Sequence, residues 1–441
     1  MTRRYDDALA GLQAAGRLPS VVGAVAERGS PAWWGRAGAD PAPSPETAYR
    51  IGSITKTLTA VLVLQLAEAG EVDLDDPVGR FLPDAPHGGA TVAGLLSHTA
   101  GLPSEPSGEW WERTPGTDRA ALFSANAGRP AIADAGELYH YSNLGFALLG
   151  AVVEEAHGTS WWEAVRTRLL TPSGMAATAY LPPEGCAPGR SVDHFTGRLT
   201  AEPHADTGAM APAGQLWSTP ADLLVWAGVL AHGHPGILGE AWAARMREPV
   251  APAVDYGLGV RLLRVGGRSW VGHTGSMPGF QASLFVDPAT DDAVAVLANA
   301  TTGLPSDRVP GLVLAVDPPA PPEPWRPTAT LPVSLAGVPG LWFWGNTAYS
   351  LEWWGSDLRL RDVRTGEVGD RFVVAGDGAD ARIIGSDGYH RGEGLTVHRD
   401  AAGAVAHLEC ATFVYTRTPY DPASPAPGGH PDTVRGSENV F

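Results

Sequence analysis

A serine and a lysine lie three residues apart in the segment YRIGSITKTLTA, where Ser53 precedes Lys56. Lys56 is the only lysine among the 31 lysines and arginines of the chain. Residues three apart share one face of a helix, so the amine can reach the hydroxyl. A buried lysine can lose its charge and accept the serine proton, whereas an arginine, with a pKa above about 12, stays charged. The spacing predicts a serine nucleophile with a lysine base, and the alternative is a serine that only caps a helix.

A tyrosine and an asparagine follow about 90 residues later, at Tyr141 and Asn143 in LYHYSNLGFALLG. Beside a serine–lysine pair, a tyrosine hydroxyl can relay protons to a leaving group, and an asparagine amide can bind a substrate carbonyl. The alternative is a tyrosine packed on the core and an asparagine that caps the next helix. We therefore predict Tyr141 as a proton relay and Asn143 as a substrate contact.

A third polar group, His273-Thr274-Gly275, stands in SWVGHTGSMPGF on a predicted strand. A glycine in a strand lets another backbone approach closely, which suits a strand that lines a cleft. The backbone N–H of Ser276 is predicted to pair with that of Ser53 as an oxyanion hole. The alternative is an edge strand with an ordinary histidine. We predict His273, Thr274, Gly275 and Ser276 as substrate-binding residues.

The elements that must hold these groups indicate an α+β fold. One apolar strand is predicted early, at 21–29, and a short strand ends at Ile51. Apolar segments from residue 256 onward are typical of four consecutive antiparallel strands. Predicted helices span residues 5–16, 53–69, 143–157, 160–170 and 220–232. An antiparallel sheet flanked by helices, with a helical subdomain, would place the three groups at a helix start, before a second helix and on a late strand.

A proline-rich segment, DPPAPPEPWRP, interrupts this pattern and predicts an extended linker. Beyond it, short alternating strands rich in tryptophan indicate a small all-β barrel or sandwich. The final residues have the composition of a disordered tail. The predicted division is a catalytic domain at 1–316, a linker at 317–333, a β domain at 334–421 and a tail at 422–441.

The composition argues against several classes of function. The net charge is −17 and no basic stripe is present, so nucleic acid is not expected as a partner. Cys186 and Cys410 lie far apart and belong to no metal-binding motif, so no metal is expected. Both are predicted to be free thiols, and the alternative is a structural disulfide between them. No apolar run is long enough for a membrane span or a secretory signal, so we expect a cytoplasmic protein that is not bound to a membrane.

The order Ser-x-x-Lys, Tyr-x-Asn, His-Thr-Gly resembles the serine β-lactamase and penicillin-binding-protein superfamily. The similarity is to its branch of class C β-lactamases, D,D-peptidases and esterases, and it extends over roughly residues 5 to 305 through VAGLLSHTAGLP, WSTPADLLVWA and GHTGSMPGF. It implies Ser53 as the acylated nucleophile, Lys56 as its base and Tyr141 as the proton relay. Many members carry Lys-Thr-Gly where this chain has His273, which replaces a permanent cation with a titrating group and disfavours β-lactam hydrolysis. His98, in LSHTAGL, is predicted to hold its loop.

The C-terminal segments LWFWGNTAYSLEWWG and AHLECATFVYTRTPYDP are similar to the lipocalin-like domain of penicillin-binding-protein-type thioesterases, which release and cyclise nonribosomal peptides. The resemblance implies that Ser53 takes a peptide with a D-configured or glycine C-terminal residue from a peptidyl carrier domain of a nonribosomal peptide synthetase. The peptide's own amine would then release it as a head-to-tail macrolactam. No cofactor is expected for the enzyme itself, and the resemblance implies that the substrate is presented on the phosphopantetheinyl arm of the carrier. Arg417 is the candidate for reaching the cleft from this domain, and its alternative role is an ordinary salt bridge at the domain interface.

Two other functions fit the same residues. The first is an intracellular serine esterase, D-amino-acid amidase or D,D-peptidase, which would use the same serine and lysine with water as the acceptor. The second is a binding protein on a catalytically retired hydrolase scaffold, and the three intact polar groups argue against it.

Overall fold

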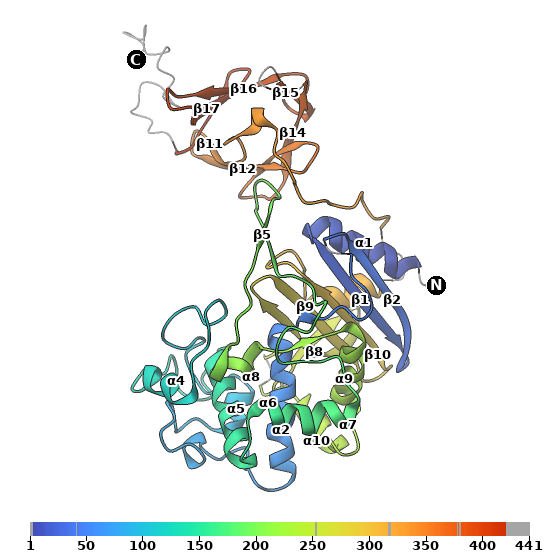
Figure 1. The fold of residues 1–441 in the computed structure, drawn as a ribbon, viewed down its shortest axis with the longest axis vertical. Coiled ribbons are helices and arrows are strands. Elements are labelled where there is room, and N and C mark those ends of the chain that lie inside the picture. Colours follow the sequence, from blue (N-terminus) through green and yellow to red (C-terminus); the bar gives the residue numbers. More distant parts are fainter. Residues whose placement is uncertain are drawn as a thin grey trace. The chain divides into compact units, whose positions relative to one another are not determined.

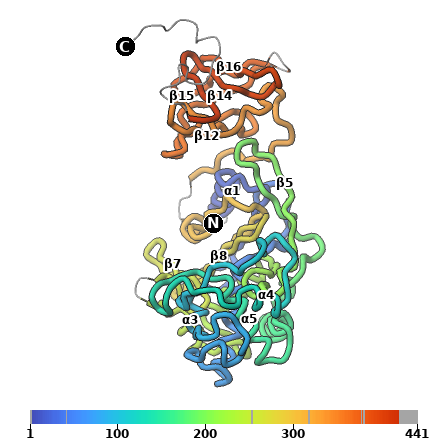
Figure 2. The backbone as a smooth tube through the Cα atoms, turned by 90° about the vertical axis from the view of Figure 1, so that its left-hand side faces the viewer, coloured from blue at the N-terminus to red at the C-terminus, as the bar shows by residue number. Residues whose placement is uncertain are grey.

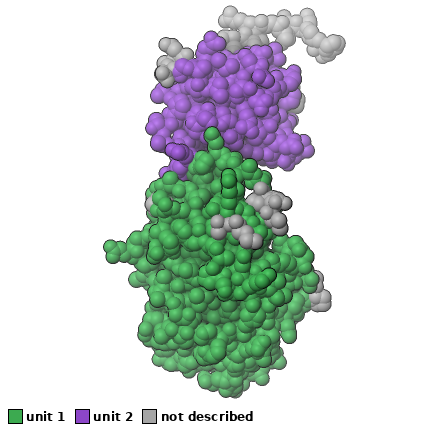
Figure 3. Space-filling view, turned by 90° about the vertical axis from the view of Figure 1, so that its right-hand side faces the viewer, with its two compact units in different colours: residues 1–191, 201–325 green, residues 192–200, 326–441 purple. Residues whose placement is uncertain are grey.

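The structure is a computed structural model that describes residues 3–40, 42–251, 254–315, 319–376, 378 and 381–419. The chain divides into two compact units (Figure 3). Unit 1 comprises Met1–Ser191 and Ala201–Trp325, and unit 2 comprises Val192–Thr200 and Arg326–Phe441. The division after Trp325 falls inside the segment predicted as a linker, and the predicted tail lies outside the described residues.

Unit 1 is built on an antiparallel sheet with the strand order β2-β1-β10-β9-β8-β7 in the described residues (Figure 1). The run from β7 to β10 confirms the predicted late strands. The early strand predicted at 21–29 is present as β1, but its neighbour β2 was not predicted. The sequence of β2 contains a proline and two glycines, which are tolerated in a strand at the edge of a sheet. The bounds are β1 Ser20–Glu27, β2 Ser30–Gly38, β7 Arg261–Val265, β8 Arg268–Met277, β9 Phe280–Asp287 and β10 Asp292–Ala298.

Helices cover both faces of this sheet, because its strands are apolar on both sides. On β10, Val294 and Val296 belong to one core cluster, whereas Ala295 and Leu297 belong to the other. Alternate residues of a strand point to opposite faces, so the two clusters lie on the two sides of the sheet. The first cluster includes residues of α1 (Arg3–Gly16) and α11 (Val309–Val313), and the second those of α2 (Thr55–Glu68) and α9 (Pro220–His232).

The predicted helices are present, and their ends have physical causes. Helix α5 covers Asn143–His157 as predicted; the Ser142 side chain caps it by accepting from the Gly145 N–H, and Gly158 ends it with a φ of 63°. The cap is therefore Ser142 and not Asn143. The predicted 160–170 helix is α6 followed by a π-helical turn. Further helices are α3 Val92–Leu96, α4 Arg119–Asn126, α6 Trp161–Val165, α7 Thr171–Ser173, α8 Ala211–Gly214 and α10 Glu240–Met246, and short strands are β3 Tyr49–Arg50, β4 Arg190–Val192, β5 Leu199–Ala201 and β6 Trp217–Ser218.

Unit 2 contains a closed barrel in which strands β11 to β18 pair in chain order and β18 returns to β11 (Figure 2). Alternate side chains fill its interior, among them Trp342, Leu351 and Leu408. Closure leaves no free strand edge, so the small all-β domain is a barrel and not a sandwich. The strands are β11 Gly340–Trp344, β12 Thr347–Trp353, β13 Leu358–Asp362, β14 Val368–Ala375, β15 Arg382–Gly388, β16 Gly394–Arg399, β17 Val405–Cys410 and β18 Phe413–Thr416.

A segment far from the barrel in sequence, Val192–Thr200, belongs to unit 2 by its contacts. The Phe195 carbonyl accepts a hydrogen bond from the Trp353 N–H at 2.7 Å, and the Gly197 carbonyl accepts one from the Thr328 N–H at 3.0 Å. Nothing in the sequence of this segment predicts these bonds.

No helix in the described part of the chain combines the length and apolar content that crossing a bilayer requires.

Candidate active site

The predicted nucleophile lies where β3 gives way to α2. Ser53 sits in a short 3-10 helix, Gly52–Ile54, and neither this turn nor α2 has a side-chain cap. The helix-cap alternative for Ser53 is therefore excluded. Gly52 has a φ of 53°, and a Cβ there would lie 2.6 Å from the Ser276 nitrogen. The backbone of Ser276 is thus held against the residue before the nucleophile, where an oxyanion hole would need it.

Lys56 is fully buried and its amine is held by two acceptors. Its Nζ donates to the Ser53 Oγ at 3.0 Å and to the Ala213 carbonyl of α8 at 2.6 Å. The Nζ also lies 5.0 Å from the centroid of the Tyr141 ring. Burial lowers the pKa of Lys56 from its usual value to about 7. Near neutral pH a large fraction of Lys56 is therefore neutral and able to accept the serine proton.

Two carboxylates that the sequence analysis did not single out act on Lys56. The negative charges of Glu105 and Glu112 raise its pKa and so oppose part of the effect of burial. Glu105 also accepts hydrogen bonds from Asn143 Nδ2 and Trp111 Nε1, both at 2.7 Å. The two acids stand among tryptophans in a loop between α3 and α4, and no spacing relates them to Ser53.

Tyr141 precedes α5, and its side chain lies beside Lys56 and Ser53. Burial raises the pKa of its phenol well above the usual value, and a hydrogen bond with Ser53 acts in the opposite direction. The hydroxyl of Tyr141 therefore keeps its proton at neutral pH and can donate it to a leaving group. Beside it, Asn143 Nδ2 donates to Glu105, while the buried Oδ1 of Asn143 has no hydrogen-bond partner among the described residues. That oxygen can accept from a substrate N–H.

Three buried side chains, His98, Tyr256 and His273, form a hydrogen-bonded relay next to the site. The donor of each hydrogen bond follows from which groups carry a proton. The Ser142 N–H donates to His98 Nδ1 at 3.0 Å, and burial keeps His98 neutral by lowering its pKa. The other nitrogen of His98 must then donate to the Tyr256 hydroxyl at 3.1 Å. Tyr256 donates in turn to His273 Nε2 at 3.0 Å, and His273 Nδ1 donates to the Thr274 carbonyl at 2.5 Å. His98 thus has a structural role, as predicted, but the loop that its side chain holds is the one before α5.

The expectation that His273 titrates near neutral pH was wrong. Its side chain is 1% exposed, and burial lowers its pKa to about 3. Burial outweighs the hydrogen bond to the Thr274 carbonyl, which raises the pKa of His273, and the nearby cations Lys56 and Arg261 lower this pKa further. The reason for Gly275 also differs from the expected one, because a Cβ there would lie 1.9 Å from the Ile51 carbonyl oxygen. Gly275 lets β8 pack against the segment that carries Ser53.

A cavity of about 530 Å³ opens onto Ser53. It brings together the predicted residues Tyr141, His273, Thr274, Gly275 and Ser276, and it is lined in addition by Tyr139, Arg261, Gln281 and residues 304–307. Arg261 supplies a cation, and its Nη1 donates to Thr274 Oγ1 at 2.9 Å. The sequence analysis missed Arg261, although the pairing of β7 with β8 sets it opposite Gly272. The register of these two strands, which could have been counted from the turn between them, is the signal that identifies it.

Arg417, predicted as a cleft residue from the β domain, is engaged within unit 2. Its guanidinium lies 3.6 Å from the Trp342 ring centroid and donates to the carbonyls of Gly337 and Leu341. These contacts lie where β18 pairs with β11, and Arg417 forms no salt bridge with the residues that the structure describes. A role for Arg417 toward substrate stays a prediction.

The arrangement as a whole is suited to acyl transfer through a serine ester. It contains a nucleophile in contact with a base whose pKa is about 7, a phenol that keeps its proton, a candidate oxyanion hole and an amide oxygen without a partner. The cation of Arg261 provides a place for a negative or strongly polar group of the substrate.

Comparisons with known proteins agree with this chemistry. The family model described as beta-lactamase matches residues 5–315, and a domain of unknown function, DUF7586, matches residues 331–417. Penicillin-binding protein 4 of Amycolatopsis lactamdurans is 32% identical over 284 residues, which are 58% of this chain and 72% of that protein. The D-alanyl-D-alanine-carboxypeptidase/endopeptidase AmpH of Escherichia coli is 28% identical over 201 residues, 43% of this chain and 51% of the relative.

Two solved structures are also similar to this chain. A D-stereospecific amidohydrolase from Streptomyces sp. is 27% identical with a TM-score of 0.60, and the match covers 70% of this chain and 98% of that one. The structure of SurE is also 27% identical with a TM-score of 0.60, and it covers 94% of this chain and 99% of SurE. Since the matched family region includes Ser53, Lys56 and Tyr141, the chain belongs to the beta-lactamase and penicillin-binding-protein superfamily of serine hydrolases.

Proposed function

We propose that this protein is a stand-alone penicillin-binding-protein-type thioesterase that releases a peptide from its thioester as a head-to-tail macrolactam. The observation that carries the proposal is the contact of the Lys56 amine, with a pKa of about 7, with the Ser53 hydroxyl. The likeness to SurE adds support, because it covers 94% of this chain and so includes the barrel as well as unit 1. SurE has also been solved with D-Leu, which agrees with a D-configured acyl residue.

In the first half of the reaction, neutral Lys56 takes the proton of Ser53 while the serine oxygen bonds to the thioester carbon. The backbone N–H groups of Ser53 and Ser276 would stabilise the negative oxygen of the intermediate. As the carbon–sulfur bond breaks, Tyr141 gives its proton to the sulfur and regains one from the Lys56 ammonium. A thiol leaves, and Lys56 is neutral again.

In the second half, the amine at the other end of the peptide attacks the ester on Ser53. Lys56 accepts the proton that the amine loses, and the serine oxygen takes a proton back as its bond to carbon breaks. Both ends of the peptide are held on one enzyme, so the amine competes with water through its effective concentration. The amide oxygen of Asn143 and the cation of Arg261 are the groups that would orient the peptide.

The proposal is tested with synthetic peptidyl thioesters of N-acetylcysteamine that end in a D-residue. We expect a product lighter than the linear acid by one water, detected by mass spectrometry, and a much slower reaction of the diastereomer that ends in an L-residue. Ser53→Ala should release neither product. If linear acid alone forms at every peptide length tested, the cyclase proposal is wrong.

A second candidate is a hydrolase of D-amino-acid amides or peptides. The likeness to a D-stereospecific amidohydrolase at 27% identity favours it, and the same Ser53 ester would then be released by water. Incubation with amides of D-amino acids distinguishes the two, because this candidate requires ammonia release to outpace macrolactam formation. A folded sample in which a fluorophosphonate fails to label Ser53 would instead point to a binding protein.

A further inference from the structure

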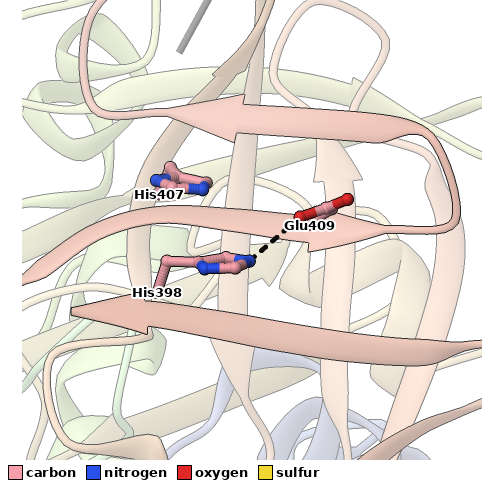
Figure 4. Close-up of side chains that lie close together, drawn as sticks. All are labelled: His398, His407 and Glu409. Carbon is pink, nitrogen blue, oxygen red and sulfur yellow. Dashed lines mark hydrogen bonds and ion pairs between the residues drawn. The ribbon is translucent and has the colours of Figure 1, made fainter. Parts of the chain in front are cut away.

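Two histidines and a glutamate gather on one face of the barrel in unit 2, whereas Ser53 and Lys56 belong to unit 1. His398 of β16 is paired directly with His407 of β17, and Glu409 follows two residues later on β17. Residues two apart on a strand point to the same side, so all three share a face. The neighbouring Leu408 and Cys410 belong to the interior core cluster, which places the three polar residues on the other side of the strands. Figure 4 shows the three side chains close together.

The three side chains converge closely enough to share one ion. Each offers one ligand atom, and these atoms all lie within 4.8 Å of one another. The two imidazole rings are stacked with centroids 4.2 Å apart and planes at 9°, and His398 Nε2 lies 3.0 Å from Glu409 Oε2. Zinc binds nitrogen and oxygen ligands at about 2.0–2.2 Å. Ligand atoms around one ion therefore lie closer together than the 4.8 Å that separates the most distant of these three. Because the lone pair of an imidazole nitrogen lies in the ring plane, the two stacked rings would have to tilt toward one another by side-chain rotation to bind the same ion.

The three residues of the cluster differ in burial: His407 is buried, whereas His398 and Glu409 are partly exposed. The His407 residue is 4% exposed, whereas the side chains of His398 and Glu409 are 31% and 37% exposed. An ion could enter from the side of the two exposed residues and be held against the buried one. The two strands are hydrogen-bonded neighbours in a closed barrel, so the ligands are held on rigid elements before any ion arrives.

We propose that His398, His407 and Glu409 bind one divalent transition-metal ion, with zinc as the best fit. Two imidazoles select zinc, copper or nickel over magnesium and calcium, which prefer oxygen ligands. Three protein ligands leave a fourth tetrahedral position for water. The ion would lock the pairing of β16 and β17 from outside the barrel.

The competing explanation is a simple histidine–carboxylate pair between His398 and Glu409. That pair does not require a second imidazole directly across the strand. The chain contains another such pair, His232 with Asp291, and it belongs to no group of three potential ligands in the described residues. His232 therefore provides a matched control, in which a histidine–carboxylate pair exists without a third ligand.

The test uses the full-length protein without an affinity tag, freed of metal by a chelator. Zinc binding is measured by titration calorimetry and by metal content after dialysis, and Co²⁺ serves as a spectroscopic probe of tetrahedral geometry. We expect one ion per chain and a higher melting temperature of the barrel with zinc. Binding should be unchanged in Ser53→Ala, which separates this proposal from the proposed enzymatic function.

Variants decide which residues hold the ion. His398→Ala, His407→Ala and Glu409→Gln should each raise the dissociation constant by more than the roughly 10- to 100-fold that loss of an outer-shell partner costs. His232→Ala should leave it unchanged. Because His407 is buried, the exposed His398 and Glu409 variants keep the test valid if His407→Ala fails to fold. Zinc binding that is absent, or equal in wild type and in these two variants, overturns the proposal.

Discussion

Lys56 is the residue whose protonation decides what this site can do. Its amine is buried, is held by the Ala213 carbonyl and contacts Ser53, so both its position and its pKa favour the role of a base. An arginine in the same place would keep its charge and could not accept a proton. This physical difference explains why the only lysine of the chain stands here.

Substitution Lys56→Arg should therefore abolish turnover while the fold is kept. We expect kcat/KM for a thioester or ester substrate to fall by about 100- to 10,000-fold, the range that positioned acid–base groups contribute. Arg264→Lys, an equivalent exchange at an exposed position of β7, is the matched control and should change little. Circular dichroism checks that both variants are folded. An active Lys56→Arg enzyme would exclude the general-base role.

The pH dependence follows from the same group. Because burial lowers the pKa of Lys56 to about 7, activity should rise as pH increases through about 7, where the amine loses its proton. Glu112 raises this pKa, so Glu112→Gln should move the acid limb of the kcat/KM profile to lower pH, by up to about one unit. Glu109→Gln, an exposed charge in the same loop, should leave the limb in place. A shift to higher pH in Glu112→Gln would contradict this electrostatic account.

At the scale of elements, the site is held by contacts between segments that are far apart in sequence. The 3-10 turn before α2 meets β8 at two glycines, and α8 supplies the carbonyl that holds the lysine. The relay of His98, Tyr256 and His273 joins the loop before α5 to β8. These bonds fix the spacing between the element that carries the nucleophile and the elements that surround it.

Tyr256→Phe tests the relay. The change leaves a buried N–H of His98 and a buried ring nitrogen of His273 without their partner, each of which costs about 1–3 kcal/mol. We expect the free energy of unfolding of unit 1, measured with denaturant, to fall by a similar amount. Tyr139→Phe is the control, because Tyr139 is 38% exposed at the cavity rim. Equal stability of the two variants would mean that the relay contributes nothing to the fold.

At the scale of the whole molecule, the chain has separate hydrophobic cores. Two clusters fill the two sides of the sheet in unit 1, and a third fills the barrel of unit 2. Units with their own cores commonly unfold as separate cooperative transitions. The net charge of −17 keeps such a chain dispersed in solution, but it does not determine which unit is the more stable.

Calorimetry should therefore resolve two transitions, and core substitutions should affect them selectively. Leu149 of α5 and Leu358 of β13 are both fully buried, so each Leu→Ala change should cost about 2–5 kcal/mol in its own unit. Leu149→Ala is expected to lower only the transition of unit 1, and Leu358→Ala only that of the barrel. A single transition that both substitutions shift equally would show that the cores unfold together.

The sequence by itself determined the elements and the chemistry of the nucleophile. Periodic apolar residues and local caps act over a few residues, so they predicted α5, α9 and the late strands with nearly correct ends. The three-residue spacing of Ser53 and Lys56 is also local, and it predicted their contact. Only the tertiary structure decided the rest, because burial and the pairing of segments depend on contacts that short-range spacing in the sequence does not reveal. It gave Lys56 its lowered pKa, kept His273 neutral, brought Arg261 and Glu105 to the site, and set His407 across from His398.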